Sequence, residues 1–411
     1  VRGGFGVMYD RIYNNLFENI RFNPPYFSDN QVGYFTGISG SVVGAISSPG
    51  LLSYPFTSTP RFAGGAGVVP NPRHMDQNIV SPYYEQTHFG LQWEFAKGWV
   101  FEPEYVGTWG RKLTGIVDIN TYDGRISGAG ATTRINPNVG SDNFRGNKFD
   151  SNYHALQLSI RKTYSSGLSL TGNYTYSKTL DELSDAFNSK IGLNPTDNQN
   201  IGYDYGPADF DVRHRVVATI GYELPFMKQN RWIGGWGVNS IVSWQTGHPF
   251  SPYSGSSHYD LNKDGKRTDR LVPTVAPMDT LLHGSPAGNA DGTGGYFDTT
   301  KWVRYTCPAN VNGGFWCNAP IGRNSIFGPH FANVDFNIAK RFKITESAGL
   351  TFQANFFDLF NHPNFLPPGI SAIGTAAGGT NDLSSDFGKS TATAGDNGGH
   401  RITQLALRFD F

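Results

Sequence analysis

Apolar and polar residues alternate with a period of two in segments spread along most of this chain. Leu156, Leu158 and Ile160 are separated by small or polar residues, and the end of the chain, from Leu405 to Phe411, repeats the pattern. This period is typical of β-strands whose two faces meet different surroundings. It predicts ten strands, near residues 2–10, 82–96, 98–113, 152–165, 167–180, 208–226, 234–252, 331–344, 348–361 and 400–411.

The connections between these predicted strands alternate between long and short. The short ones lie at residues 96–98, 165–167, 227–234 and 345–349, and the long ones near 11–81, 114–151, 181–207, 253–330 and 362–399. Outer-membrane barrels have short periplasmic turns and long extracellular loops. The sequence therefore predicts an all-β fold, an antiparallel transmembrane β-barrel, with a periplasmic C-terminus and extracellular long loops in the bacterial outer membrane.

Aromatic residues gather near the short turns. A ring with one polar edge is stable at the level of the lipid headgroups, so we expect these residues to form a girdle against the outer-membrane lipid. The alternative is that they fill the core of a soluble β protein. The candidates are Trp93, Trp99, Phe101, Tyr164, Tyr222, Phe226, Trp232, Trp236 and Phe342.

Composition agrees with this fold and excludes several others. Lysine plus arginine and aspartate plus glutamate number 33 each, so the net charge of +0 gives no case for a nucleic-acid partner. No run of 18 apolar residues predicts a membrane helix, and no signal segment precedes the first strand. Because the chain opens on a strand-like segment, we expect a part of the protein to precede Val1.

One acidic segment of the 253–330 loop resembles half of a calcium-binding loop. Asp260, Asn262 and Asp264 place oxygens at positions 1, 3 and 5, and Gly265 at position 6 allows a sharp turn. Position 12 holds leucine instead of the usual bidentate glutamate, and Asp269 is the nearest replacement. The two hypotheses are a Ca²⁺ ion that stiffens the loop and a polar turn that binds nothing.

Cys307 and Cys317 are the only cysteines, and both lie in the same long loop. An extracellular loop is in an oxidising compartment, so we expect a disulfide between them. Free thiols or a metal site are the alternative, but neither CxxC spacing nor paired histidines support it.

Charged residues alternate from Asp209 through Asp211 and Arg213 to Arg215. We expect a ladder of charges that faces the barrel lumen from one strand, with Arg161, Asp335 and Arg408 as partners from other strands. Such a ladder either contacts a plug or a polar substrate, or forms structural charge pairs within the lumen.

No catalytic constellation is evident. The ten histidines are scattered, and the motifs HExxH, GxSxG and GxxxxGK[ST] do not occur. The sequence therefore predicts a protein that is not an enzyme and requires no cofactor.

Five segments together resemble the C-terminal part of Oar-like TonB-dependent outer-membrane proteins, which often carry a carboxypeptidase-regulatory-like domain. They are residues 2–10, 209–215, 322–325, 356–365 and 407–411. The resemblance implies a barrel of ~22 strands, with a plug and a TonB-binding segment. Residues 1–411 would then be the C-terminal portion of one barrel, and the plug and remaining strands would precede them. We expect the barrel-assembly machinery to recognise the last strand, with Phe409 and Phe411.

Three functional hypotheses follow. The first is a TonB-dependent transporter whose extracellular loops capture a ligand that passes through the lumen. The second is a passive porin, or a structural or adhesion barrel. The third is a secreted, soluble, β-rich carbohydrate-binding protein or glycosidase, for which paired carboxylates on neighbouring strands are needed.

Overall fold

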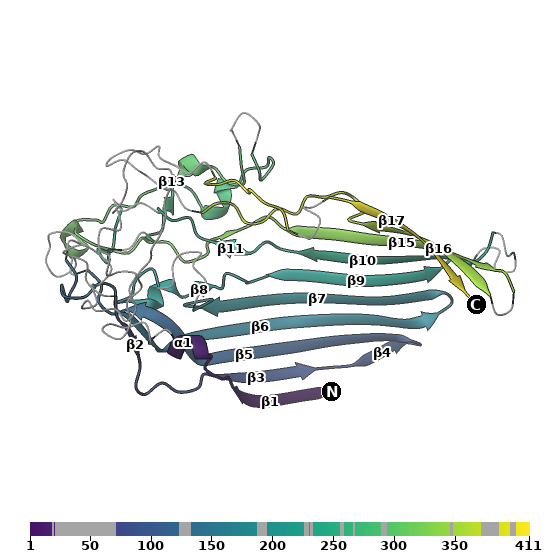
Figure 1. The fold of residues 1–411 in the computed structure, drawn as a ribbon, viewed down its shortest axis with the longest axis horizontal. Coiled ribbons are helices and arrows are strands. Elements are labelled where there is room, and N and C mark those ends of the chain that lie inside the picture. Colours follow the sequence, from purple (N-terminus) through teal and green to yellow (C-terminus); the bar gives the residue numbers. More distant parts are fainter. Residues whose placement is uncertain are drawn as a thin grey trace, which may run out of the picture.

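The computed structural model shows the chain as one long, curved sheet with a mass of loops at one end (Figure 1). It describes residues 1–18, 20, 71–122, 133–186, 195–225, 230, 233–254, 259–265, 268–288, 294–345, 348–370, 386–394 and 400–411. Among these residues, no helix is long and apolar enough to cross a membrane.

Ten strands pair in chain order, each antiparallel to the next, and we call this sheet the wall. They are β1 (Arg2–Tyr9), β3 (Tyr83–Gly90), β5 (Trp99–Asp118), β6 (Asn143–Ser165), β7 (Leu168–Asp181), β9 (His214–Glu223), β10 (Trp236–Gln245), β15 (Phe331–Lys343), β16 (Gly349–Phe357) and β17 (Ile402–Asp410). Three short strands are attached: β2 (Arg73–Met75) to β6, β4 (Trp93–Ala96) to β5, and β8 (Gly206–Pro207) to β7.

The ten predicted strands are confirmed, with differences at their ends. β5 and β6 extend to Asp118 and back to Asn143, beyond the predicted limits. β9 begins only at His214, because residues 208–213 form a turn, and the strand predicted at 82–96 is divided into β3 and β4. The alternation of connections is also confirmed: the short ones lie at one end of the wall and the long ones at the other (Figure 1).

The register of the wall separates its two faces. Residues paired across six neighbouring strands form one wholly apolar row: Leu168, Tyr222, Val238, Ile338, Ala354 and Leu405. The next row, one residue along each strand, is small or polar: Ser169, Gly221, Asn239, Asn337, Asn355 and Gln404. Because successive side chains point to opposite sides of a strand, the wall has one apolar face and one polar face.

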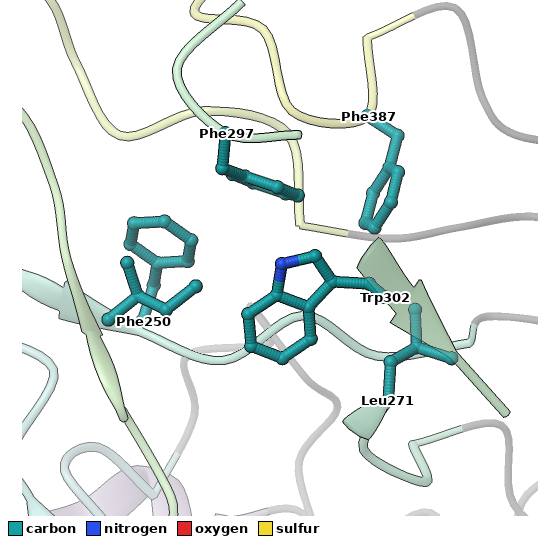
Figure 2. Packing of buried hydrophobic residues seen from close by; sticks show 6 residues of the cluster. Phe250, Leu271, Phe297, Trp302 and Phe387 are labelled. Carbon is teal, nitrogen blue, oxygen red and sulfur yellow. The ribbon is translucent and has the colours of Figure 1, made fainter. Parts of the chain in front are cut away.

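The buried hydrophobic residues lie mostly in the long-loop segments and not on the wall. The larger cluster comprises Phe250, Leu271, Phe297, Trp302, Ile326 and Phe387 (Figure 2). Its backbone is held by two small sheets, β11 (Pro249–Phe250) with β14 (Ile326–Phe327) and β12 (Val272–Pro273) with β13 (Trp302–Val303). We call this packed region, residues 249–327 with 386–390, the loop unit.

The helical elements of the described residues are short. They are α1 (Asn14–Glu18) and four 3₁₀ turns, η3 (Ile201–Asp204), η4 (Pro277–Thr280), η5 (Thr299–Lys301) and η6 (Asn312–Gly314). Asp298 caps η5 by accepting a hydrogen bond from the backbone N–H of Thr300. Such short turns need no apolar stripe, and η4, η5 and η6 lie within the loop unit.

Candidate functional site

The apolar face of the wall exposes large side chains. Leu405, Leu407 and Phe5 are 67%, 68% and 69% exposed, and each alternates with small or polar neighbours. An apolar row of partly exposed side chains across six neighbouring strands is more than a soluble monomer usually presents to water. It fits the lipid-facing band of an outer-membrane barrel.

Aromatic and lysine side chains border this face at the short-turn end. Trp99 lies beneath the ammonium of Lys162, and Trp236 lies beneath that of Lys340, at 5.3 and 5.5 Å from the ring centroids. These four residues, with Phe342, form what we call the short-turn girdle. Its place agrees with the prediction for Trp99, Trp236 and Phe342.

The remaining girdle candidates have different positions. Tyr164 donates a hydrogen bond of 2.7 Å to Glu223 Oε2 and lines the polar face, so its assignment to the girdle was wrong. Trp93 is 62% exposed and its ring contacts Phe95. Phe101 and Tyr222 lie in the apolar rows. Phe226 and Trp232 lie outside the described residues.

A second set of rings borders the apolar face at the long-loop end. The hydroxyls of Tyr105 and Tyr174 lie 2.7 and 2.8 Å from Nδ1 of His154 and His214. Trp109 packs edge-on against the His154 ring. Trp99 and Trp109 share one face of β5, and the strand between them spans roughly 26 Å of membrane at a tilt of ~40°. This second girdle was not predicted, because the pairs form only through the register.

Amides cross the polar face as a ladder. Asn239 donates to Asn337 Oδ1 at 3.1 Å, and Asn337 donates to Asn355 Oδ1 at 2.6 Å. Asn355 in turn donates to Gln404 Oε1 at 3.5 Å. The ladder therefore links four strands with neutral amides, and its two middle members, Asn337 and Asn355, both donate and accept.

A hollow of about 740 Å³ lies beside this ladder on the polar face, near the short turns. Glycines make room for it: a Cβ on Gly221 would stand 2.8 Å from Ser169 Oγ. Charged and polar side chains from several strands line it, namely Tyr164, Glu223, Arg341, Gln353, Arg408 and Asp410. The hollow offers both signs of charge to a polar occupant.

The predicted charge ladder is not formed within one strand. Asp209 and Asp211 precede β9, whose first residue is His214, and only Arg215 belongs to the strand. Asp211 pairs with Arg213 at 3.1 Å and accepts the backbone N–H of Thr179 at 2.7 Å. These contacts form at the turn of residues 208–213 and not within a strand.

The three residues that we expected to pair with that ladder also have other neighbours. Arg408 pairs with Asp410 at 2.7 Å. Asp335 accepts hydrogen bonds from Asn333 and from the backbone of Asp358. Arg161 lies on the polar face of β6, where Val100 and Thr171 are its neighbours across the strands.

Asp209 instead joins a buried ion network centred on Arg323. The Arg323 guanidinium is 2.6 Å from Asp181 Oδ1 and 3.0 Å from Asp209 Oδ1, and it is 6% exposed. Burial alone lowers the pKa of Arg323, but the two carboxylates outweigh it and raise the pKa. Asn324 adds a hydrogen bond of 2.8 Å to the same Asp209 oxygen. The network thus ties the loop unit to the end of the wall.

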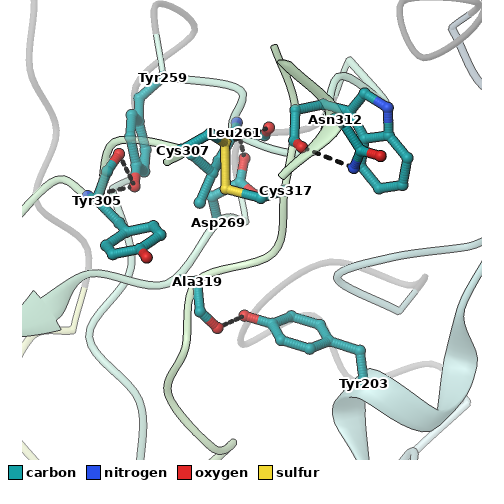
Figure 3. The surroundings of a disulfide bond; sticks show 10 residues. Tyr203, Tyr259, Leu261, Asp269, Tyr305, Cys307, Asn312, Cys317 and Ala319 are labelled. Atoms are coloured by element: carbon teal, nitrogen blue, oxygen red, sulfur yellow. Dashed lines mark hydrogen bonds between the residues drawn. A yellow bond between two sulfur atoms is a disulfide. The ribbon is translucent and has the colours of Figure 1, made fainter. Parts of the chain in front are cut away.

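The predicted disulfide between Cys307 and Cys317 is confirmed (Figure 3). The Cα atoms are 5.7 Å apart, and the bond closes the segment that contains η6. Cys317 belongs to a second buried cluster with Tyr259, Leu261 and Ala319. The Tyr259 hydroxyl accepts the backbone N–H of Tyr305 at 2.7 Å and donates to its carbonyl at 3.2 Å.

The acidic loop lies against this second cluster. Asp260 accepts the backbone N–H groups of Asp264 and Gly265, at 3.0 and 2.8 Å, and Asn262 Oδ1 also accepts that of Asp264. Gly265 has a φ of +84°, and a Cβ there would meet the Tyr122 ring at 2.0 Å. The sharp turn that the sequence predicted at Gly265 is therefore present.

Asp269 is brought to the same loop and is 4% exposed. It accepts the backbone N–H of Leu261 at 3.0 Å (Figure 3). Burial, with the nearby Asp260 and Asp264 carboxylates, raises the pKa of Asp269 to about 8. Among the described residues, no group of three or more His, Cys, Asp or Glu side chains is arranged to hold a metal ion. Calcium binding stays a prediction.

Solved structures with a similar fold are outer-membrane transporters and receptors. They include the outer membrane transporter YddB from Escherichia coli (11% identity, TM-score 0.42) and the siderophore receptor PiuA from Acinetobacter baumannii (11%, 0.39). The alignments cover 84% and 81% of this chain but only 34% and 29% of those proteins. This chain therefore spans about a third of their length.

The family comparison covers nearly the whole sequence. No curated protein matches the chain. A family model described as an outer membrane beta barrel domain matches residues 1–404. The two-faced wall, its aromatic borders and this match lead to one conclusion: the chain belongs to the outer-membrane β-barrel family.

Proposed function

We propose that this chain is the C-terminal part of an Oar-like, TonB-dependent transporter or receptor. The observation that carries the proposal is the combination of a lipid-fitting apolar face with a polar face that contains a hollow of about 740 Å³. A wall built only as a scaffold needs no such hollow. The resemblance of residues 209–215 and 322–325 to Oar-like proteins supports the same function.

In this proposal the loop unit captures a ligand outside the cell, and the ligand passes along the polar face with energy from TonB. The clusters around Phe297 and Tyr259 give the loop unit a rigid core, which supports a binding surface better than unpacked loops do. The plug and the TonB-binding segment would come from the part of the protein that precedes Val1. The barrel-assembly machinery would engage the last strand through Phe409 and Phe411.

The first experiment tests the barrel and its coupling. Heat-modifiability on a gel of the detergent-extracted full-length protein is expected to show a faster band before boiling. The intact mass is expected to exceed 45.1 kDa by far, and the protein is expected to copurify with TonB. A folded barrel that does not bind TonB would instead favour a passive porin or an adhesion barrel. A protein that is soluble without detergent would contradict the proposal.

A second experiment tests the orientation. Val311 lies between the two cysteines and is 38% exposed, and Ile344 lies at a short turn and is 46% exposed. Because Cys307 and Cys317 form a disulfide, neither reacts with a maleimide, and the unsubstituted protein gives the background labelling. An impermeant maleimide should label Val311→Cys in intact cells and Ile344→Cys only after lysis. The reverse result would overturn the proposed orientation.

A further inference from the structure

Lys340 is an exception in the apolar face of the wall. By register it stands between Trp236 on β10 and Phe352 on β16, both in the apolar rows. Its side chain is 1% exposed, and its Nζ has no hydrogen-bond partner among the residues that the structure describes. An ammonium group that leaves water without partners for its three N–H donors is strongly destabilised.

Two aromatic rings hold this ammonium. Nζ lies 5.0 Å from the centroid of the Phe342 ring and 5.5 Å from that of the Trp236 ring. Cation–π attraction to two rings offsets part of the desolvation cost, but it supplies no acceptor for the N–H donors. An anionic oxygen is the group that would complete these contacts.

The direction of the side chain points to the source of that oxygen. A Cβ built on Gly235 would be 3.9 Å from Nζ, so the ammonium lies beyond Trp236, toward the end of β10 and the short turns. A lysine stem that follows an apolar surface toward a strand end carries its charge to the headgroup level. At that level the abundant anionic oxygens belong to phospholipid phosphates.

We propose that Lys340, Trp236 and Phe342 form a binding site for the phosphate of a phospholipid in the leaflet at the short-turn end. Because Lys340 is 1% exposed, the phosphate reaches the ammonium only when a covering ring moves aside. The ammonium then donates to the phosphate, and the two rings pack against the upper acyl chains. This site depends on the membrane placement of the wall and not on the transport role, so either idea can fail alone.

Lys162 provides a matched control. It also lies on the apolar face near the short turns, and its ammonium is 5.3 Å from the Trp99 ring centroid. Its Nζ, however, already donates to Ser165 Oγ at 2.7 Å. A lysine with an internal acceptor has less to gain from a phosphate, so Lys162 tests whether any girdle lysine would give the same result.

The experiment measures lipid binding by native mass spectrometry of the delipidated, full-length protein in detergent. Phosphatidylglycerol is the probe, and diacylglycerol, with the same tails but no phosphate, is its control. Wild type is expected to bind phosphatidylglycerol more tightly than diacylglycerol. Lys340→Met should weaken phosphatidylglycerol binding by about tenfold or more, Lys340→Arg should largely preserve it, and Lys162→Met should change it little.

Several results would overturn the proposal. One is equal binding of the two lipids by wild type, which is decisive even if a variant does not fold. Another is unchanged phosphatidylglycerol binding in a Lys340→Met variant that heat-modifiability shows to be folded. A third is an equal loss of binding in Lys162→Met. Displacement of the lipid by millimolar inorganic phosphate would show that the site takes free phosphate and not a headgroup.

Discussion

Arg323 and Asp209 are 114 residues apart in the sequence, yet Arg323 Nη2 lies 3.0 Å from Asp209 Oδ1. Asp209 lies in segment 209–215 and Arg323 in segment 322–325, two of the five segments that resemble Oar-like proteins. Their contact fixes the loop unit on the end of the wall, together with Asp181 and Asn324.

Loss of the Arg323 side chain should loosen the loop unit. Arg323→Ala leaves two carboxylates near the end of β7 without their cation, and removal of one partner from a buried ion network costs about 3–5 kcal/mol. Limited proteolysis of the loops should become much faster, while heat-modifiability of the barrel persists. Arg408→Ala is the control, because its pair with Asp410 is exposed and worth less than about 1 kcal/mol. If the loops of Arg323→Ala and Arg408→Ala resist proteolysis equally well, the network does not have this structural role.

Reduction of the Cys307–Cys317 bond should destabilise the same region. A closed loop of this size stabilises by roughly 2–3 kcal/mol through the freedom that it removes from the unfolded chain. Intact mass after alkylation should reveal two additional groups only after reduction. Cleavage near η6 should then accelerate, and Cys307→Ser should reproduce this effect without reductant. A wild-type protein that is alkylated without reductant would show that the disulfide is absent.

The stability of the loop unit should fall as pH rises from about 4 to about 8. The pKa of Asp269 is raised to about 8 from an ordinary value of 3.8. Between these pH values the folded loop therefore keeps a proton on Asp269 that the unfolded chain releases. The stabilisation that results from this proton is largest at the acidic end of the range. Hydrogen exchange of the loop amides measures it. In Asp269→Asn the stability of the loop unit should depend less on pH. A wild-type stability that rises with pH over this range would refute the prediction.

Calcium, if it binds the acidic loop, should protect that loop from proteases near neutral pH. The ion would replace the proton on Asp269 and neutralise Asp260 and Asp264. A chelator is therefore expected to speed cleavage of residues 259–272 in wild type but not in Asp260→Ala. Asp298→Ala, which removes a cap elsewhere in the loop unit, serves as the control. If wild type is cleaved at the same rate with and without chelator, the loop is a polar turn that binds no calcium.

The two faces of the wall should respond differently to the same substitution. Val242 and Ser243 are neighbours on β10 that point to opposite faces. Val242→Arg places a charge in the apolar band and should cost about 2–4 kcal/mol near mid-membrane. Ser243→Arg should cost much less. Urea unfolding in lipid vesicles compares them, and a larger penalty for Ser243→Arg would reverse our assignment of the faces.

The strands of the wall were predictable because alternation is a local property. A strand such as β17 needs only its own residues to show which side chains share a face, and the lengths of the connections then give the order of strands. The missed residues depend on register or on distant loops. The Tyr105–His154 pair exists only because β5 and β6 align as they do. The cluster of Phe250, Phe297 and Phe387 draws on loop segments without periodicity.

Some errors had a signal in the sequence. The residues just before β9 include Asp209 and Asp211, and aspartate is depleted in strands, so this charged segment was open to a turn. Lys340 stands where alternation calls for an apolar residue, between Ile338 and Phe342. A charged residue in an otherwise apolar row is itself a signal of a functional contact.

The placement of the buried core in the loop unit has a consequence for how this protein can diverge. The wall is constrained by lipid on one face and by its neighbours in register, whereas the loop unit is held by its own clusters, by buried ion pairs of Arg323 and Arg270, and by a disulfide. A related protein could therefore carry a different loop unit on the same wall, provided that it kept the equivalents of Asp181 and Asp209 as the point of attachment. The surface that the loop unit presents could change while insertion into the membrane stayed the same.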